Sequence, residues 1–135
     1  MAEAPDICPT LRYEDAKAAI TLLTEAFGFT ATAVYEGEDG RVMHAELSHG
    51  NGMVMLGSAG TGGAFDKLMA GGGPVGVYVR VDDVDEHHAR AAAHGAEIVM
   101  PPTDQEYGSR DYMARDAEGN VWSFGTYAPG AAAAD

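Results

Sequence analysis

The chain has 135 residues, of which 46% are hydrophobic, and this is enough for one compact domain with a substantial core. Its formal net charge is −13, from 21 acidic against 8 basic residues, which disfavours nucleic acid and anionic membrane surfaces as partners. The single cysteine, Cys8, excludes an intrachain disulfide and a four-thiolate zinc site. An acidic surface can attract a cationic ligand, although it also simply keeps a protein in solution.

The sequence shows no sign of export or membrane insertion. No apolar run approaches the length of a membrane-spanning helix, and residues 1–6 lack the basic and then apolar pattern of a secretory leader. We therefore expect a cytoplasmic protein that forms a single domain over residues 1–135.

The first half of the chain predicts one strand, one helix and three further strands. In chain order these are a strand over 7–12, a helix over 16–27, and strands over 30–35, 42–47 and 53–56. Asp15 can cap the start of the helix, and Gly28 can adopt the left-handed conformation that ends it.

A glycine-rich stretch over residues 58–74 follows, with Phe65, Leu68 and Met69 near its middle. Long loops in compact domains are often functional. The stretch is therefore either a plain linker or a mobile flap that presents apolar groups to a ligand, and both interpretations stay open here.

The second half repeats the order of elements in the first. The predicted elements are a strand over 75–81, a helix from 84 to 94, a strand from 97 that Pro101 and Pro102 break, and strands over 112–115 and 121–127. Asp83 and Glu86 fit a capping box at the start of the helix. The same interval separates Gly40 from Gly108 and Gly57 from Gly125, which indicates an internal repeat.

The repeated unit resembles the vicinal-oxygen-chelate superfamily, which comprises glyoxalases, bleomycin-resistance proteins and extradiol dioxygenases. The resemblance covers about residues 7–127 and depends on the stretches 116–120, 107–111, 12–15 and 80–83. It implies an α+β fold of two βαβββ modules, 7–57 and 75–127, which form a curved mixed sheet with the helices on its outer face. Members commonly dimerise, so the resemblance also implies a homodimer.

The same resemblance places the metal ligands of the family at Cys8, Met55, Gly76 and Ser123. Divalent metals of this kind prefer imidazole or carboxylate ligands. Gly76 has no side chain, and Met55 offers only a soft thioether. We therefore expect no metal and no other cofactor, as in the metal-free bleomycin-resistance-like members.

Strand alternation assigns faces to the candidate ligand-binding residues. Met43, Ala45 and Leu47 are expected to face the helices, which points Val42, His44 and Glu46 into the groove, and the repeat then points Arg110 and Tyr112 inward. The full set of candidates is Thr10, His44, Glu46, Met53, Met55, Phe65, Tyr78, Tyr107, Arg110, Tyr112 and Ser123. Mostly apolar walls with a few polar groups are typical of a small-molecule site.

His44 and Glu46 are the candidate catalytic residues, because two residues apart on a strand place them on one face. The alternative is a polar pair at the rim of the groove.

Three functions remain at this point. The first is a metal-independent protein that sequesters a small aromatic or cationic molecule, as antibiotic-resistance proteins of the resembled family do. The second is a glyoxalase-like lyase or isomerase with a displaced site. The third is an accessory protein whose exposed methionines contact another protein.

Overall fold

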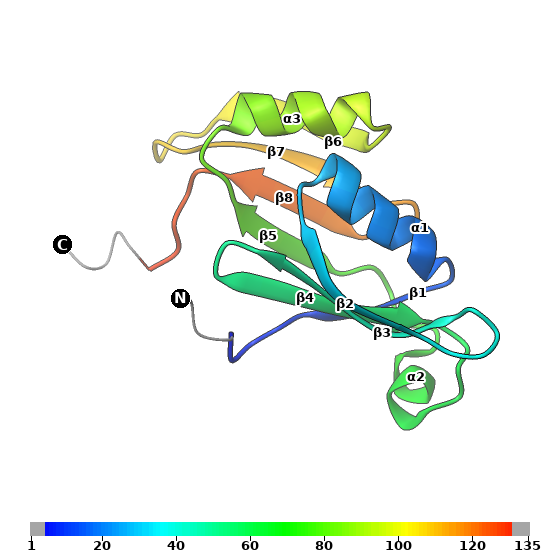
Figure 1. Ribbon diagram of the computed structural model, residues 1–135. Helices are drawn as coiled ribbons and strands as arrows, with labels where there is room; N and C mark the ends of the chain where they lie inside the picture. The colour runs from blue at the N-terminus through cyan, green and yellow to red at the C-terminus, as the bar shows by residue number, and fades with distance from the viewer. Residues whose placement is uncertain (1–4, 131–135) are drawn as a thin grey trace. The chain divides into compact units, whose positions relative to one another are not determined.

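The computed structural model describes residues 5–130. The chain consists of two compact units, whose boundary in the sequence lies between Gly73 and Pro74. Each unit contains one four-stranded mixed sheet together with helices (Figure 1). This is the α+β fold of two βαβββ modules that the sequence predicts. None of the helices in the described part of the chain is long and apolar enough to cross a membrane.

The first unit begins with β1 and ends with a short helix in the glycine-rich stretch. Its elements are β1 (Thr10–Tyr13), α1 (Ala16–Thr21), η1 (Leu22–Ala26), β2 (Thr30–Glu36), β3 (Val42–His49), β4 (Gly52–Ser58) and α2 (Ala64–Met69). The strand order is β1-β4-β3-β2, with β1 parallel to β4 and the other pairs antiparallel.

The second unit has the same plan without the extra helix. Its elements are β5 (Gly76–Arg80), α3 (Val84–Ala93), β6 (Glu97–Asp104), β7 (Arg110–Arg115) and β8 (Val121–Gly125). The order is β5-β8-β7-β6, with only β5 and β8 parallel. Asp83 caps α3 as predicted, since its carboxylate accepts a hydrogen bond from the Glu86 backbone N–H at 3.0 Å.

Each sheet buries one face and leaves the other partly exposed. Val54 and Leu56 on β4, and Trp122 and Phe124 on β8, are buried, as strand alternation predicts. Helix α1 packs on β1 and β4, and α3 packs on β6 and β7 (Figure 1). The residues between the buried ones therefore form a second face in each sheet, here called the open face.

The turn between β7 and β8 explains the 116–120 motif. Asp116 is buried, and its carboxylate accepts hydrogen bonds from the backbone N–H groups of Glu118 and Asn120, the Asn120 side chain and the Trp122 indole N–H, all at 3.0–3.1 Å. One short side chain thus closes the turn and anchors the largest residue of the core.

Three predicted boundaries are wrong for physical reasons. The first strand starts at Thr10 rather than residue 7, and Pro9 directly precedes it. The predicted helix over 16–27 changes to π geometry at Leu22, where the Phe27 N–H donates to the Leu22 carbonyl. Strand β6 continues through Pro101 and Pro102 because it lies at a sheet edge and its register shifts between Met100 and Thr103.

Candidate functional site

The open face of the first sheet presents methionines beside polar side chains. Met53 and Met55 on β4 are half-buried. Met55 is the register partner of Thr10 on β1 and of Glu46 on β3, so these three residues form one row across the sheet. Methionine is flexible and polarizable, and a row of this kind can adapt to an aromatic ligand.

His44 and Glu46 form a direct contact on this face, as their spacing predicts. The distance from His44 Nε2 to Glu46 Oε2 is 2.8 Å, and the two side chains are 42% and 36% exposed. The imidazole also stacks on Tyr35 of the edge strand β2, with ring centroids 6.2 Å apart. A carboxylate that orients an imidazole is one component of general base catalysis, and by itself it is also an ordinary surface pair.

A bulge in β3 overturns the faces expected for Val42 and Met43. Tyr35 of β2 pairs with His44, whereas the next residue, Glu36, pairs with Val42, so Met43 is the extra residue on β3. Val42 is consequently fully buried and Met43 is 52% exposed. Val42 is therefore not a groove residue.

The inward orientation predicted for Tyr112 is also wrong. Tyr112 pairs with Phe124 in the way that Ala45 pairs with Leu56, so its structural counterpart is Ala45 rather than His44. The prediction failed because the two halves were aligned without the extra residue in β3. An alignment that is wrong by one residue assigns every side chain of a strand to the opposite face. The Tyr112 ring is fully buried and stacks on Phe124 at 5.2 Å.

Arg110 is likewise directed away from the predicted groove. Its guanidinium donates to Asp85 at the start of α3, at 2.9 Å, and to Asp104 at the end of β6, at 3.0 Å. These contacts join β7 to the helix that covers the buried face of the sheet.

The open face of the second sheet contains a row equivalent to that of the first. Ser123 on β8 is the register partner of Tyr78 on β5 and of Met113 on β7. Ser123 and Met113 are half-buried, and Tyr78 is 38% exposed. Sequence analysis identified Tyr78 and Ser123, but it missed Met113 because the repeat was aligned without the bulge.

Two further tyrosines lie beside Tyr78. The Tyr78 hydroxyl donates to the Tyr127 carbonyl at 2.6 Å, and the Tyr127 ring meets the Tyr107 ring edge to face, with centroids 6.1 Å apart. Tyr107 and Tyr127 are 67% and 45% exposed. Tyr107 was a sequence candidate, whereas Tyr127 was read only as the end of a strand.

Asp111 completes this group, which we call the tyrosine cluster (Tyr78, Tyr107, Tyr127 and Asp111). A Cβ placed on Gly125 would lie 2.8 Å from the Asp111 Cβ and 3.0 Å from the Tyr78 hydroxyl, so both side chains lie close to this glycine. Burial, followed by the negative charge of Asp111, raises the pKa of Tyr78 above its usual value of 10.0.

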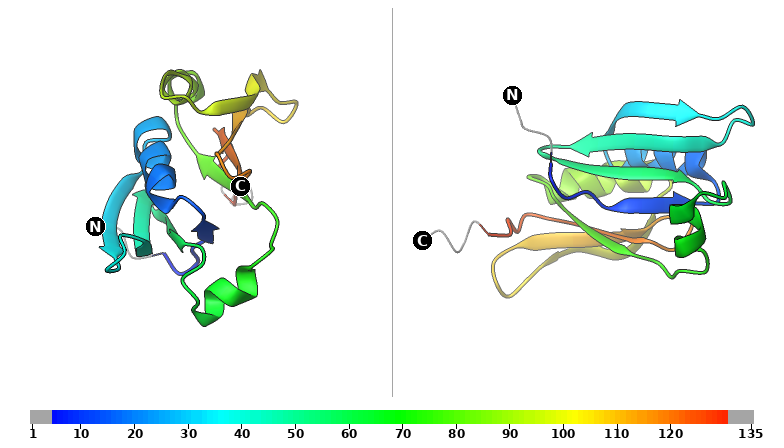
Figure 2. Two further views of the ribbon diagram at one scale, coloured as in Figure 1. Left: turned by 90° about the vertical axis from the view of Figure 1, so that its right-hand side faces the viewer. Right: turned by 90° about the horizontal axis from the view of Figure 1, so that it is seen from below.

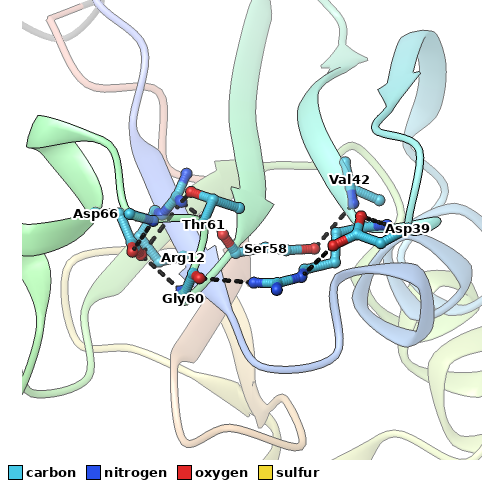
Figure 3. Close-up of polar contacts among 9 residues, drawn as sticks. Arg12, Asp39, Val42, Ser58, Gly60, Thr61 and Asp66 are labelled. Atoms are coloured by element: carbon cyan, nitrogen blue, oxygen red, sulfur yellow. Dashed lines mark hydrogen bonds and ion pairs between the residues drawn. The ribbon is translucent and has the colours of Figure 1, made fainter.

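The glycine-rich stretch is attached to the first sheet through Arg12. The Arg12 guanidinium donates to the Ser58 carbonyl, to the Thr61 hydroxyl at 3.0 Å and to Asp66 at 3.3 Å (Figure 3). Helix α2 accordingly lies beside the ends of β1 and β4 in both figures of the whole chain (Figures 1 and 2). The candidate Phe65 is 44% exposed, and its ring lies 5.7 Å from the Arg12 guanidinium carbon.

The donor set at the positions of the family's metal ligands does not fit a divalent cation. In the first unit these positions offer the Cys8 thiol, which lies 3.9 Å from the Pro5 carbonyl, and the Met55 thioether. In the second unit Gly76 offers nothing, and Ser123 offers a neutral hydroxyl. Thioether and hydroxyl are poor ligands for zinc, nickel or iron(II). Nor does any group of three or more His, Cys, Asp or Glu residues with metal-binding geometry occur within residues 5–130.

Comparison with known proteins places the chain in a family. A family model described as Glyoxalase/Bleomycin resistance protein/Dioxygenase superfamily matches residues 8–124. An uncharacterized protein of Mycobacterium bovis is 33% identical over 125 residues, which are 90% of this chain and 82% of that protein. The chain belongs to the glyoxalase/bleomycin resistance protein/dioxygenase superfamily, as the residue pattern predicts.

Solved structures agree with this assignment. TioX from Micromonospora sp. ML1 is 36% identical, with a TM-score of 0.79 over 93% of this chain and 100% of that chain. Glyoxalase I from Zea mays is 20% identical, with a TM-score of 0.68 over 88% of this chain and 43% of that chain. The similarity to the maize enzyme is one of fold alone.

Proposed function

We propose that this chain is a metal-independent binding protein that sequesters a small aromatic or cationic organic molecule on the open faces of its sheets. The observation that carries the proposal is the composition of these faces. Met53, Met55 and Met113 provide adaptable apolar surface, and Tyr78 and Ser123 provide hydrogen-bonding groups beside it. The unsuitable metal-ligand positions and the net charge of −13 support the same proposal.

The proposal is tested by calorimetric titration of the whole chain with two flat aromatic dyes of opposite charge, methylene blue (cationic) and fluorescein (anionic). We expect saturable binding of methylene blue and much weaker binding of fluorescein. Both titrations are repeated at about 0.5 M salt, where the screening length falls to roughly 4 Å and nonspecific attraction to an acidic surface is suppressed. The proposal would be refuted if neither dye showed saturable binding.

Paired methionine variants assign the binding to the open face. The double variant Met53→Ala with Met55→Ala is expected to weaken methylene blue binding about ten-fold, because it removes the contact surface of two neighbouring side chains on the open face of β4. Met43→Ala is the matched control, since Met43 lies on the same sheet but at the bulge of β3. Equal weakening by the control and the double variant would contradict the assignment.

The contact between His44 and Glu46 favours one alternative, a glyoxalase-like lyase or isomerase with a displaced active site. In that case His44→Ala and Glu46→Ala would each abolish turnover in a glyoxalase assay and leave the melting temperature nearly unchanged. Ser48→Ala, further along the same strand, is the control. Full activity in both variants, on a substrate that the unaltered chain converts, would rule out this role.

We further propose that the working assembly is a homodimer, as members of the family commonly form, and that it acts in the cytoplasm. Light scattering coupled to gel filtration should then give twice the chain mass of 14.1 kDa. A mass equal to that of one chain would contradict the dimer without affecting the test of ligand binding.

A further inference from the structure

The tyrosine cluster has the composition of a site for a cation that does not donate hydrogen bonds. Its three aromatic residues come from β5, from the loop before β7 and from the segment after β8. These three residues remain 38% to 67% exposed, although large aromatic residues are on average more buried. Aromatic faces carry partial negative charge and attract cations within about 6 Å.

Two hydrogen-bonding groups of the cluster, the Tyr78 hydroxyl and the Asp111 carboxylate, already have partners. The Tyr78 hydroxyl donates to the Tyr127 carbonyl, and the Gln105 amide donates to Asp111 at 2.7 Å. A primary ammonium group would need several acceptors to replace its water. An alkylated ammonium group is weakly hydrated and needs none, so it suits a site of ring faces with one carboxylate.

The nearby arginines leave the charge of Asp111 available. Arg110 pairs with Asp85 and Asp104, and Arg80 pairs with Asp82 at 3.3 Å. No salt bridge to Asp111 is found within residues 5–130. Among the charged groups that shift the pKa of Tyr78, Asp111 has a larger effect than Arg80, in keeping with a carboxylate near the Tyr78 hydroxyl.

Gly125 allows the cluster to form. Any larger residue at this position would place a Cβ between Asp111 and the Tyr78 hydroxyl. The absence of a side chain leaves room for Asp111 and the Tyr78 hydroxyl on the same side of β8, as a site that combines a charge with aromatic groups requires.

We propose that the tyrosine cluster binds the methylated ammonium group of a ligand. This inference rests on the proposed function and specifies both the chemical class of the ligand and the part of the fold that recognises it. The ring faces and the Asp111 carboxylate attract the positive charge, and the methyl groups contact the rings.

The test compares two probes of the same shape, choline and its uncharged analogue 3,3-dimethylbutan-1-ol, by NMR titration of the ¹⁵N-labelled chain. We expect choline to shift the amide signals of residues 107, 111 and 127 in a saturable way, with at least ten-fold weaker binding of the analogue. Equal binding of the two probes, or choline-induced shifts confined to other residues, would overturn the proposal.

Single variants distinguish the contribution of the Tyr107 ring to choline binding from that of the Asp111 charge. Asp111→Asn removes the charge and still offers an oxygen to Gln105, so we expect about ten-fold weaker choline binding with the fold retained. Tyr107→Ala is expected to have a comparable effect, whereas Tyr107→Phe keeps the ring face and should bind nearly as well as the unaltered chain. Glu38→Gln makes the same change in net charge in the other unit and is expected to leave choline binding unchanged.

The two proposals fail in distinguishable ways. If methylene blue binds but Asp111→Asn and Tyr107→Ala have no effect on either the dye or choline, the tyrosine cluster is not the site and the binding function stands. If choline binds with the expected dependence and neither dye binds, the cluster is confirmed as a cation site and sequestration of aromatic compounds is refuted.

Discussion

Arg12 and Asp66 join the first strand to the helix of the glycine-rich stretch, across 54 positions of sequence, with a distance of 3.3 Å between guanidinium and carboxylate. Their side chains are only 16% and 12% exposed. Asp66 also accepts hydrogen bonds from the backbone N–H groups of Gly60 and Gly62, at 2.9 and 3.0 Å. The segment that the sequence left open as linker or flap therefore contains a helix with defined attachments.

Asp66→Ala is expected to release α2 from the sheet, because it removes the acceptor shared by Arg12, Gly60 and Gly62. Hydrogen exchange measured by mass spectrometry should show at least ten-fold faster exchange over residues 60–69 and little change in the strands. Glu36→Ala is the control, since Glu36 forms an exposed ion pair with Lys17. Unchanged exchange over 60–69 in Asp66→Ala would show that other contacts hold the helix.

Gly125→Ala is expected to destabilise the fold by about 1–3 kcal/mol, because the new Cβ would collide with the Asp111 Cβ at 2.8 Å. Gly76→Ala is the matched control in the same sheet, since its Cβ would meet nothing closer than 4.0 Å. Urea denaturation measures the free energy of unfolding of both variants. Equal stability of the two variants would mean that β7 and β8 adjust to the added carbon without cost.

Burial raises the pKa of the Tyr112 hydroxyl above its usual value of 10.0. The unfolded chain therefore ionises first, so this contribution to stability is complete below about pH 10 and is lost as the pH rises through the higher value of the folded state. We expect the free energy of unfolding to fall between about pH 8 and about pH 11, and to fall less steeply in Tyr112→Phe.

The measurement is urea unfolding followed by Trp122 fluorescence at both pH values. Because Tyr112→Phe also removes the hydrogen bond to His87, the comparison is between the two pH slopes and not between absolute stabilities. Identical slopes in the two proteins would show that another group causes the alkaline loss.

Asp116→Ala is expected to cost about 3 kcal/mol, because it leaves several buried N–H donors without an acceptor. The exposed Asp39 in the turn between β2 and β3 provides the control, and Asp39→Ala should reduce stability much less than Asp116→Ala. Thermal or urea unfolding measures the loss of stability in the two variants. Similar losses would contradict the role given to the Asp116 carboxylate.

The fold could be predicted from the sequence because it depends on local patterns. The alternation of Val54 and Leu56 with methionines, and the capping residues of α3, are visible in the sequence and determine which face of each element is buried. The order of elements in the two halves then indicates the family, and comparison with known proteins confirms it.

The site could be predicted only in part, because long-range register determines it. The extra residue Met43 has no clear signal in the sequence, and without it the two halves are aligned one residue out of step on β3 and β7. Tyr112 was therefore assigned to the open face, where the pairing of β7 with β8 places Asp111 and Met113 instead. Tyr127 was missed because its partner Tyr78 lies 49 residues away, and pairs of this kind become visible only in the fold.

The most direct test of the central claim is a calorimetric titration of methylene blue into the chelator-treated chain, repeated after addition of zinc, nickel or iron(II). We expect saturable binding without metal, with the same affinity after each metal is added. Binding that appears only after a metal is restored would contradict it, because the residues at Cys8, Met55, Gly76 and Ser123 would then have to hold an ion for which their donors are unsuited.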